Sequence, residues 1–266
     1  VLETLLISCA AGVIGTGTGG VIGLLLGESS KRSMSYLLSF ASGVMVSIVC
    51  FDLIPESLEL ASLSTVVVSI ILGAVIVQFL NALIDRLSRT PETHVELEEL
   101  HHQEEILNPQ RKQSMLMSGL VMFAAISLHN LPEGMAIGSG ASHDAQMGLT
   151  LAVLIALHNI PEGMSIGVPL IAGGMAKWKA VLLTALSGAP TLVGGALGAY
   201  LGSGGDALVA ISLALAAGAM LYVTYCEILP QVILLNQERG PAVFTIMGII
   251  LGLLRSLRLS KAPPFL

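Results

Sequence analysis

Two copies of one phrase contain the side chains in this sequence that are best suited to binding an ion. Residues 129–135 read H-N-L-P-E-G-M and residues 158–164 read H-N-I-P-E-G-M. In a helix, the His and Glu of each copy are four apart and the Asn and Glu three apart, so all three side chains share one face. Imidazole nitrogen with carboxylate oxygen suits Zn²⁺, Fe²⁺, Mn²⁺, Co²⁺ or Cd²⁺ better than Na⁺, K⁺ or Ca²⁺. The predicted ligands are His129, Asn130, Glu133, His158, Asn159 and Glu162.

The elements that must hold these phrases are long apolar segments. Hydrophobic residues make up 54% of the chain and charged residues 11%, a composition that does not suit a soluble surface. Apolar stretches of about 20 residues, the length of a membrane-crossing helix, recur without two-residue alternation. We therefore predict an all-α polytopic membrane protein. Its eight spans are approximately Leu5–Leu26, Tyr36–Pro55, Leu63–Ile84, Met115–Ser139, Met147–Ala172, Trp178–Gly202, Ala207–Leu235 and Ala242–Leu254.

Both phrases lie near the middle of spans four and five, which run antiparallel and bring them to a similar depth. An ionised carboxylate there costs on the order of 2.5 to 3.5 kcal/mol. Because no Lys or Arg occurs between positions 113 and 176, a divalent cation is the expected compensation. Pro132 and Pro161 cannot donate a backbone hydrogen bond, so each is expected to kink its helix. The prediction is an eight-helix bundle in which kinked helices four and five form a metal site at the bilayer midplane.

The positions of Lys and Arg predict the orientation in the membrane, because cytoplasmic loops hold an excess of both. The loops after spans two, four and six contain neither, which places the amino terminus on the extracytoplasmic side. Three basic residues in the tail after span eight run against this orientation and are outweighed by nine internal ones. Those nine lie in the loops after the odd-numbered spans, at Lys31, Arg32, Arg86, Arg89, Arg111, Lys112, Lys177, Lys179 and Arg239.

Residues 1–266 are interpreted as a single transmembrane domain that contains one long polar loop, residues 87–114, on the cytoplasmic side. The loop is rich in His and Glu. Its composition favours a solvated linker, and a weak, flexible metal-collecting loop is the alternative. The residues concerned are Glu92, His94, Glu96, Glu98, Glu99, His101, His102, Glu104 and Glu105.

The two phrases in consecutive spans, the His-containing loop after span three and the total of eight spans resemble the ZIP (Zrt/Irt-like) family of metal transporters over essentially the whole chain. The resemblance implies a transporter and not an enzyme, of bacterial type, in the inner (plasma) membrane. It implies that Zn²⁺, or Cd²⁺, Fe²⁺ or Mn²⁺, moves toward the cytoplasm through spans four and five as a substrate and not a cofactor. It also implies a homodimer. The expected partners are the divalent ion and the lipid bilayer, and no nucleic acid.

Carried over by position, the resemblance implies two adjacent ion sites that share the two motif glutamates. His129 and His158 complete the first site, and Asn130 and Asn159 contribute to the second. In the family a Met in span two, after Gly-x, can join the first site, and Met45 matches that position.

Span six departs from the family pattern. Many bacterial relatives have a Glu there, in a phrase like SGxxEP, that bridges the two metals. Residues 187–191 of this chain read S-G-A-P-T, so Thr191 stands where the Glu would fall. The second ion loses an anionic ligand, and the choice between one ion and two stays open.

Further polar residues lie outside the two phrases. Asp52 and Glu56, four apart near the extracytoplasmic end of span two, form either an entrance for a hydrated cation or a solvated helix end. His143 and Asp144 follow span four and fit either metal collection or ordinary loop polarity. Glu227 in span seven is a candidate ligand along the exit route, where the family also has acidic residues.

Two other classes of protein fit some of these features. An intramembrane zinc-dependent hydrolase also needs His and Glu ligands, but the H-E-x-x-H motif is missing and hydrolysis does not require two near-identical ligand triplets. A proton-coupled carrier of an organic substrate would use the same His and Glu as a proton relay. If the purified protein binds a metal ion and is stabilised by it, the result favours metal transport over the organic carrier.

Overall fold

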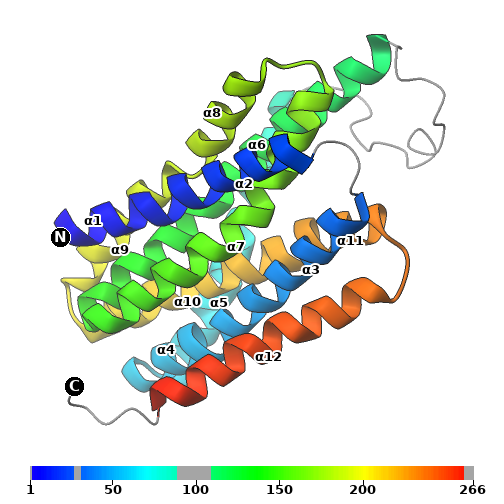
Figure 1. Cartoon of the computed structure of the whole chain (residues 1–266). Helices are drawn as coiled ribbons and strands as arrows, with labels where there is room; N and C mark the ends of the chain where they lie inside the picture. The colour runs from blue at the N-terminus through cyan, green and yellow to red at the C-terminus, as the bar shows by residue number, and fades with distance from the viewer. Residues whose placement is uncertain (1, 27–30, 89–108, 261–266) are drawn as a thin grey trace.

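The computed structural model describes residues 2–26, 31–88 and 109–260, and in these ranges the regular structure is helical throughout (Figure 1). Most spans consist of one or two helices in direct succession. The α-helices are α1 (Leu2–Cys9), α2 (Gly15–Leu26), α3 (Lys31–Ile48), α4 (Ile54–Leu60), α5 (Leu63–Ser88), α6 (Pro109–His143), α7 (Ala145–Ala172), α8 (Lys177–Ser187), α9 (Pro190–Gly202), α10 (Asp206–Val223), α11 (Leu229–Leu235) and α12 (Gly240–Ser260).

Within the described ranges, seven helical stretches are long and apolar enough to cross a membrane. They confirm the prediction of a polytopic all-α membrane protein, although several boundaries differ; span two, for example, continues past Pro55 to Leu60. The eighth, α12, has a shorter apolar part, Gly240–Leu254. Its helix continues to Ser260, beyond the predicted end at Leu254. The seven stretches are Leu2–Leu25, Arg32–Leu60, Leu63–Ala82, Met115–His143, Ala145–Ala172, Lys177–Gly202 and Asp206–Leu235.

In the part of the chain that the structure describes, three spans contain a π-helical turn that the sequence did not predict. These turns are η1 (Ala10–Ile14), η3 (Val49–Leu53) and η5 (Thr224–Ile228). Two of them directly precede a helix whose second residue is proline, Pro55 in α4 and Pro230 in α11. A proline ring clashes with the carbonyl four residues earlier in an α-helix, and a wider turn relieves that clash.

The prolines of the two repeated phrases behave differently. Pro132 lies inside α6 and Pro161 inside α7, and both helices continue without a break through them. Each proline still leaves one backbone carbonyl, that of Leu128 or Leu157, without its helical N–H partner. The two phrases are thus presented from continuous helices, near the middle of each.

The helices that carry the phrases lie at the centre of the bundle, where α6 packs on α7 and α9, and α7 packs on α2 (Figure 1). Glycines permit these close approaches. A Cβ on Gly163 would overlap the backbone oxygen of Thr16, and a Cβ on Gly134 would overlap that of Thr191. Glycines spaced four apart in α2 and in α9 contact the helices of the phrases in the same way, α2 on α7 and α9 on α6.

The other faces of α6 and α7 meet α10 and α3, which in turn pack on α5 and α12. The main hydrophobic core fills this region and includes Met45, Ile48, Ile155, Leu213 and Met220, all fully buried. Most of the predicted polar loop, residues 89–108, lies outside the described residues. Its two ends are helical, because α5 extends to Ser88 and α6 begins at Pro109.

Candidate metal centre

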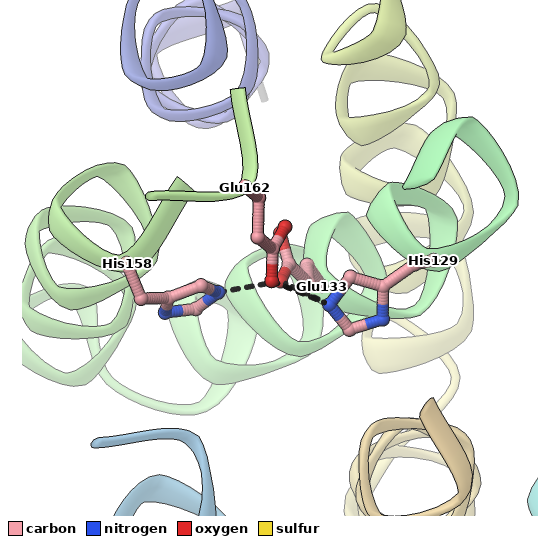
Figure 2. Close-up of side chains that lie close together, drawn as sticks. All are labelled: His129, Glu133, His158 and Glu162. Carbon is pink, nitrogen blue, oxygen red and sulfur yellow. Dashed lines mark hydrogen bonds and ion pairs between the residues drawn. The ribbon is translucent and has the colours of Figure 1, made fainter. Parts of the chain in front are cut away.

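Four side chains from the two phrases converge between α6 and α7 (Figure 2). His129 and Glu133 come from α6, and His158 and Glu162 from α7; each offers a ligand atom, and these atoms all lie within 4.8 Å of one another. All four side chains are buried, with at most 2% of any residue exposed. The structure therefore brings together the four residues that the spacing had placed on two separate helix faces. We call them the His/Glu cluster.

Glu133 is the central member of the His/Glu cluster. Its Oε1 atom lies 2.6 Å from His158 Nε2 and 2.9 Å from His129 Nε2. Glu162 Oε1 approaches His129 Nε2 alone, at 3.3 Å. Since Zn²⁺ binds His and carboxylate at about 2.0 to 2.2 Å, a tetrahedral ion needs neighbouring ligand atoms about 3.3 Å apart. A small outward movement of the shortest pairs would open that space.

The electrostatics of the His/Glu cluster also favour a cation. The two carboxylates lie in a stretch of the sequence, positions 113–176, that contains no Lys or Arg. Within the described part of the chain, Glu162 Oε1 has no hydrogen-bond donor of acceptable geometry. Buried polar atoms are nearly always paired, and a buried ionised carboxylate needs a compensating charge. A divalent ion among the four side chains would supply both.

The two motif asparagines lie on the other side of the glutamates, against spans one and six. Asn130 donates to the backbone oxygens of Ile126 and Ser187, and its oxygen accepts from Thr191 and Asn159. The sequence pointed to Thr191 only as a departure from a family pattern. The contact itself could not be predicted, because it depends on how span six is aligned with span four.

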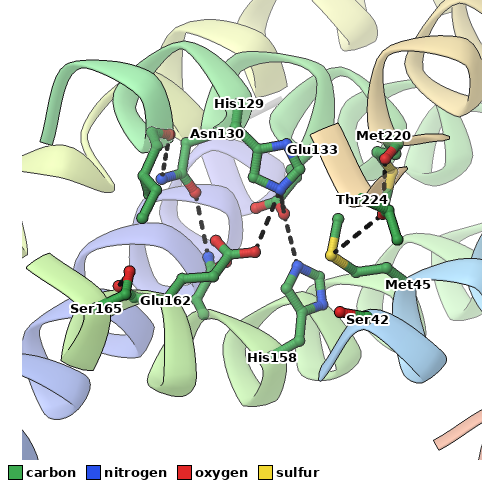
Figure 3. Close-up of polar contacts among 12 residues, drawn as sticks. Ser42, Met45, His129, Asn130, Glu133, His158, Glu162, Ser165, Met220 and Thr224 are labelled. Atoms are coloured by element: carbon green, nitrogen blue, oxygen red, sulfur yellow. Dashed lines mark hydrogen bonds and ion pairs between the residues drawn. The ribbon is translucent and has the colours of Figure 1, made fainter. Parts of the chain in front are cut away.

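Met45 is fully buried but is not a member of the His/Glu cluster. Figure 3 shows it on the His158 side, with its sulfur turned toward Thr224, whose Oγ1 donates to it at 3.8 Å. The prediction that Met45 joins the first ion site therefore requires a rotation of the Met45 side chain. The Thr224 hydroxyl has a single proton, and the backbone oxygen of Met220, at 2.8 Å, is its nearer acceptor.

The remaining predicted residues lie apart from the His/Glu cluster. Asp52 is in η3 and partly buried. Glu227 is in η5, where it accepts a hydrogen bond from the Asn81 amide of α5. Glu56 Oε1 lies 2.8 Å from His143 Nε2, a contact that links α4 to the end of α6. Asp52, Glu227 and the Glu56–His143 pair are thus not members of the His/Glu cluster.

The family model described as "ZIP Zinc transporter" matches residues 2–257 of this chain. The chain belongs to the ZIP zinc transporter family. Proteins described as "Zinc transporter ZupT" are similar to it over nearly their whole length. The one from Chlorobium chlorochromatii is 34% identical, with 90% of each chain covered. That from Akkermansia muciniphila is 32% identical, covering 96% of this chain and 95% of its own. That from Streptococcus mutans is 29% identical, with 95% of each covered.

Membership of the family confirms the resemblance inferred from the repeated phrases. Together with the apolar helices, it identifies a multi-pass membrane protein that transports divalent metal ions and is not an enzyme. The metal is a transported substrate and not a cofactor. Neither the family nor the relatives support the zinc-dependent hydrolase that the sequence had left as an alternative.

Proposed function

We propose that this chain carries Zn²⁺, with Cd²⁺, Fe²⁺ and Mn²⁺ as further candidates, across the bacterial plasma membrane toward the cytoplasm through the His/Glu cluster. The observation that carries the proposal is the set of four buried ligand side chains on α6 and α7, within 4.8 Å of one another and far from any Lys or Arg in the sequence. The names of the ZupT relatives support zinc as the first ion to test.

The proposed direction of transport rests on the orientation predicted from the basic loops. In that orientation Glu56 and His143 lie at the extracytoplasmic end of the site helices, and Glu227 lies toward the cytoplasmic end of span seven. We propose that Asp52 and Glu56 receive the hydrated ion and that Glu227 binds it on the way out. Met45 and the motif amides are further proposed parts of the site: Met45 and Asn159 as ligands, and Asn130 as the residue beside Asn159.

Influx into vesicles tests the transport proposal. Protein reconstituted with a metal indicator inside should take up Zn²⁺ and Cd²⁺ with saturation, and the Glu133→Ala, Glu162→Ala double variant should take up neither. Glu238→Ala is the control, because it removes an exposed carboxylate that pairs with Arg32 away from the site. Wild-type vesicles without influx would contradict transport, and unchanged influx in the double variant would contradict this route.

Labelling of single cysteines tests the orientation. In a background without Cys9, Cys50 and Cys226, an impermeant maleimide added to intact cells should label Ser203→Cys, in the loop before α10. Met175→Cys, in the loop before α8, should be labelled only after the membrane is opened. The reverse pattern would place the amino terminus in the cytoplasm.

The family resemblance also leads us to propose a homodimer in the bilayer. Large apolar side chains remain exposed along α5 and α12, among them Phe79 at 67% and Val243 at 55%. Exposed apolar faces of membrane helices meet either lipid or another helix. Single-molecule photobleaching of labelled protein in lipid vesicles should show two steps per spot, whereas single steps at all densities would contradict pairing.

A further inference from the structure

Asn130 uses every hydrogen-bonding position of its amide on protein partners. Its Nδ2 donates to the backbone oxygens of Ile126 and Ser187, each at 3.0 Å. Its Oδ1 accepts from Thr191 Oγ1 and from Asn159 Nδ2, each at 3.2 Å. A carboxamide has two N–H donors and one oxygen with two lone pairs. No lone pair of Asn130 therefore remains for an ion.

The contact with Asn130 decides which way the amide of Asn159 faces. Asn159 Nδ2 points to Asn130 and to the backbone oxygen of Ala11, at 3.4 Å. Its Oδ1 then lies 3.2 Å from Oε2 of both Glu133 and Glu162. If the Asn159 amide turned over, its nitrogen would donate to both carboxylates, but its oxygen would face Asn130 Oδ1 at 3.2 Å. Asn130 cannot turn with it, because backbone oxygens hold both of its N–H groups.

The buried oxygen of Asn159 consequently faces the Oε2 atoms of both glutamates, at 3.2 Å from each. Oxygens at this separation repel unless a proton or a cation lies among them. The Oε1 atoms of the same glutamates face the histidines. An all-oxygen subsite therefore lies beside the mixed nitrogen and oxygen subsite, and oxygen ligands suit harder ions such as Mn²⁺.

We propose that Asn130 is a positioning residue and that Asn159 is the only motif amide that binds the transported ion. Thr191 and the Ser187 carbonyl hold Asn130, and Asn130 holds the oxygen of Asn159 against the two glutamates. The two copies of the phrase therefore have different roles in spite of their identical spacing. This inference rests on the proposed function, because it assigns roles within the same site.

A double-mutant cycle on purified protein tests the inference. The dissociation constants of Cd²⁺ and Mn²⁺ are measured for the wild type, Asn130→Ala, Asn159→Ala and the double variant, with thermal unfolding as a check on folding. Asn159→Ala should weaken binding on the order of 10-fold to 100-fold, and Mn²⁺ more than Cd²⁺. Asn130→Ala should do the same, because the released Asn159 amide turns over and donates to the carboxylates. The double variant should bind no more weakly than Asn159→Ala alone.

Variants at Thr191 provide a second test with a milder change. Thr191→Val removes the hydroxyl that donates a hydrogen bond to Asn130, so it should weaken Mn²⁺ binding. Thr191→Ser keeps a hydroxyl at this position and should bind Mn²⁺ with nearly the wild-type affinity. Thr184→Val is the matched control. Thr184 is also a buried threonine of span six, but its hydroxyl donates to the backbone oxygen of Ala180.

Two outcomes would overturn the inference. If the losses of affinity in Asn130→Ala and Asn159→Ala multiply in the double variant, Asn130 is itself a ligand and the inference is wrong. Metal influx by the wild-type protein would then show that the transport proposal still stands. If the wild type binds neither ion and shows no influx, the inference and the proposed function both fail.

Discussion

The Nε2 atom of His143 lies 2.8 Å from Oε1 of Glu56, and this pair joins the end of α6 to α4. The two side chains are partly open to their surroundings, at 33% and 24%. His143 is ten residues beyond Glu133, which places it about 15 Å farther along the same helix. His143 therefore lies on a helix that also carries part of the His/Glu cluster, and the pair lies at the end where, in the proposed orientation, the ion arrives.

Loss of the Glu56 carboxylate should weaken capture of the ion without disabling the site. We expect Glu56→Gln to raise the KM for Zn²⁺ influx several-fold and to change the maximal rate by less than about twofold, because a rim charge mainly affects encounter. Glu59→Gln is the control, since Glu59 is exposed on the same short helix. A maximal rate that falls while KM stays constant would show that Glu56 acts in a later step.

The two glutamates should differ in importance. Glu133 Oε1 contacts both histidines, whereas Glu162 Oε1 contacts one. We expect Glu133→Gln to weaken Zn²⁺ binding by more than about 100-fold, because it removes a charge and a ligand next to both histidines. The loss of affinity for Glu162→Gln should be about ten times smaller. Isothermal titration of the two purified variants measures the difference. Equal losses would contradict a central role for Glu133.

Metal binding should weaken as the pH falls. The ligands bind an ion only as neutral imidazole and ionised carboxylate, so protons compete with the metal. With ordinary pKa values near 6.5 for His and 4.3 for Glu, the affinity present at pH 7.5 should drop by about tenfold or more at pH 5. The dissociation constant of Cd²⁺, measured across this range at fixed ionic strength, gives the answer. A constant value from pH 7.5 to pH 5 would contradict ligation by the two histidines.

A methyl group between α7 and α2 should destabilise the protein. A Cβ on Gly163 would overlap backbone atoms of Thr16, which cannot move as a side chain can. We expect Gly163→Ala to cost on the order of 1–3 kcal/mol, visible as a lower unfolding temperature in detergent. Gly167→Ala, one turn farther along α7, is the control, because its nearest neighbour, Gly20, leaves more room. Equal unfolding temperatures would show that α7 and α2 separate easily.

The sequence predicted the spans and the His/Glu cluster because both depend on local spacing. Apolar stretches of membrane length define helices, and His and Glu four apart share one face of a helix wherever that helix lies. The repetition of the phrase on consecutive, antiparallel spans then brought the two faces together. His129, Glu133, His158 and Glu162 could therefore be grouped without knowledge of the other helices.

Contacts between distant spans could not be predicted in the same way. The hydrogen bond from Thr191 to Asn130 depends on the alignment of span six with span four, which close glycine contacts determine. The direction of the Met45 sulfur depends on Thr224, far away in the sequence. The π turns were missed because the hydrophobic pattern does not distinguish a wide turn from an ordinary one.

The π turn η1 has a consequence for genetic screens of this site. Its Ala11 touches Asn159 through a backbone oxygen, and every amino acid carries such an oxygen. Substitution of Ala11 would therefore leave this hydrogen-bond acceptor in place. Deletion of a single residue from Ala10–Ile14 would restore a regular helix and swing that oxygen about 100° around the helix axis. Short deletions, and not substitution of Ala11, are the changes that would show this backbone oxygen to be part of the wall of the ion site.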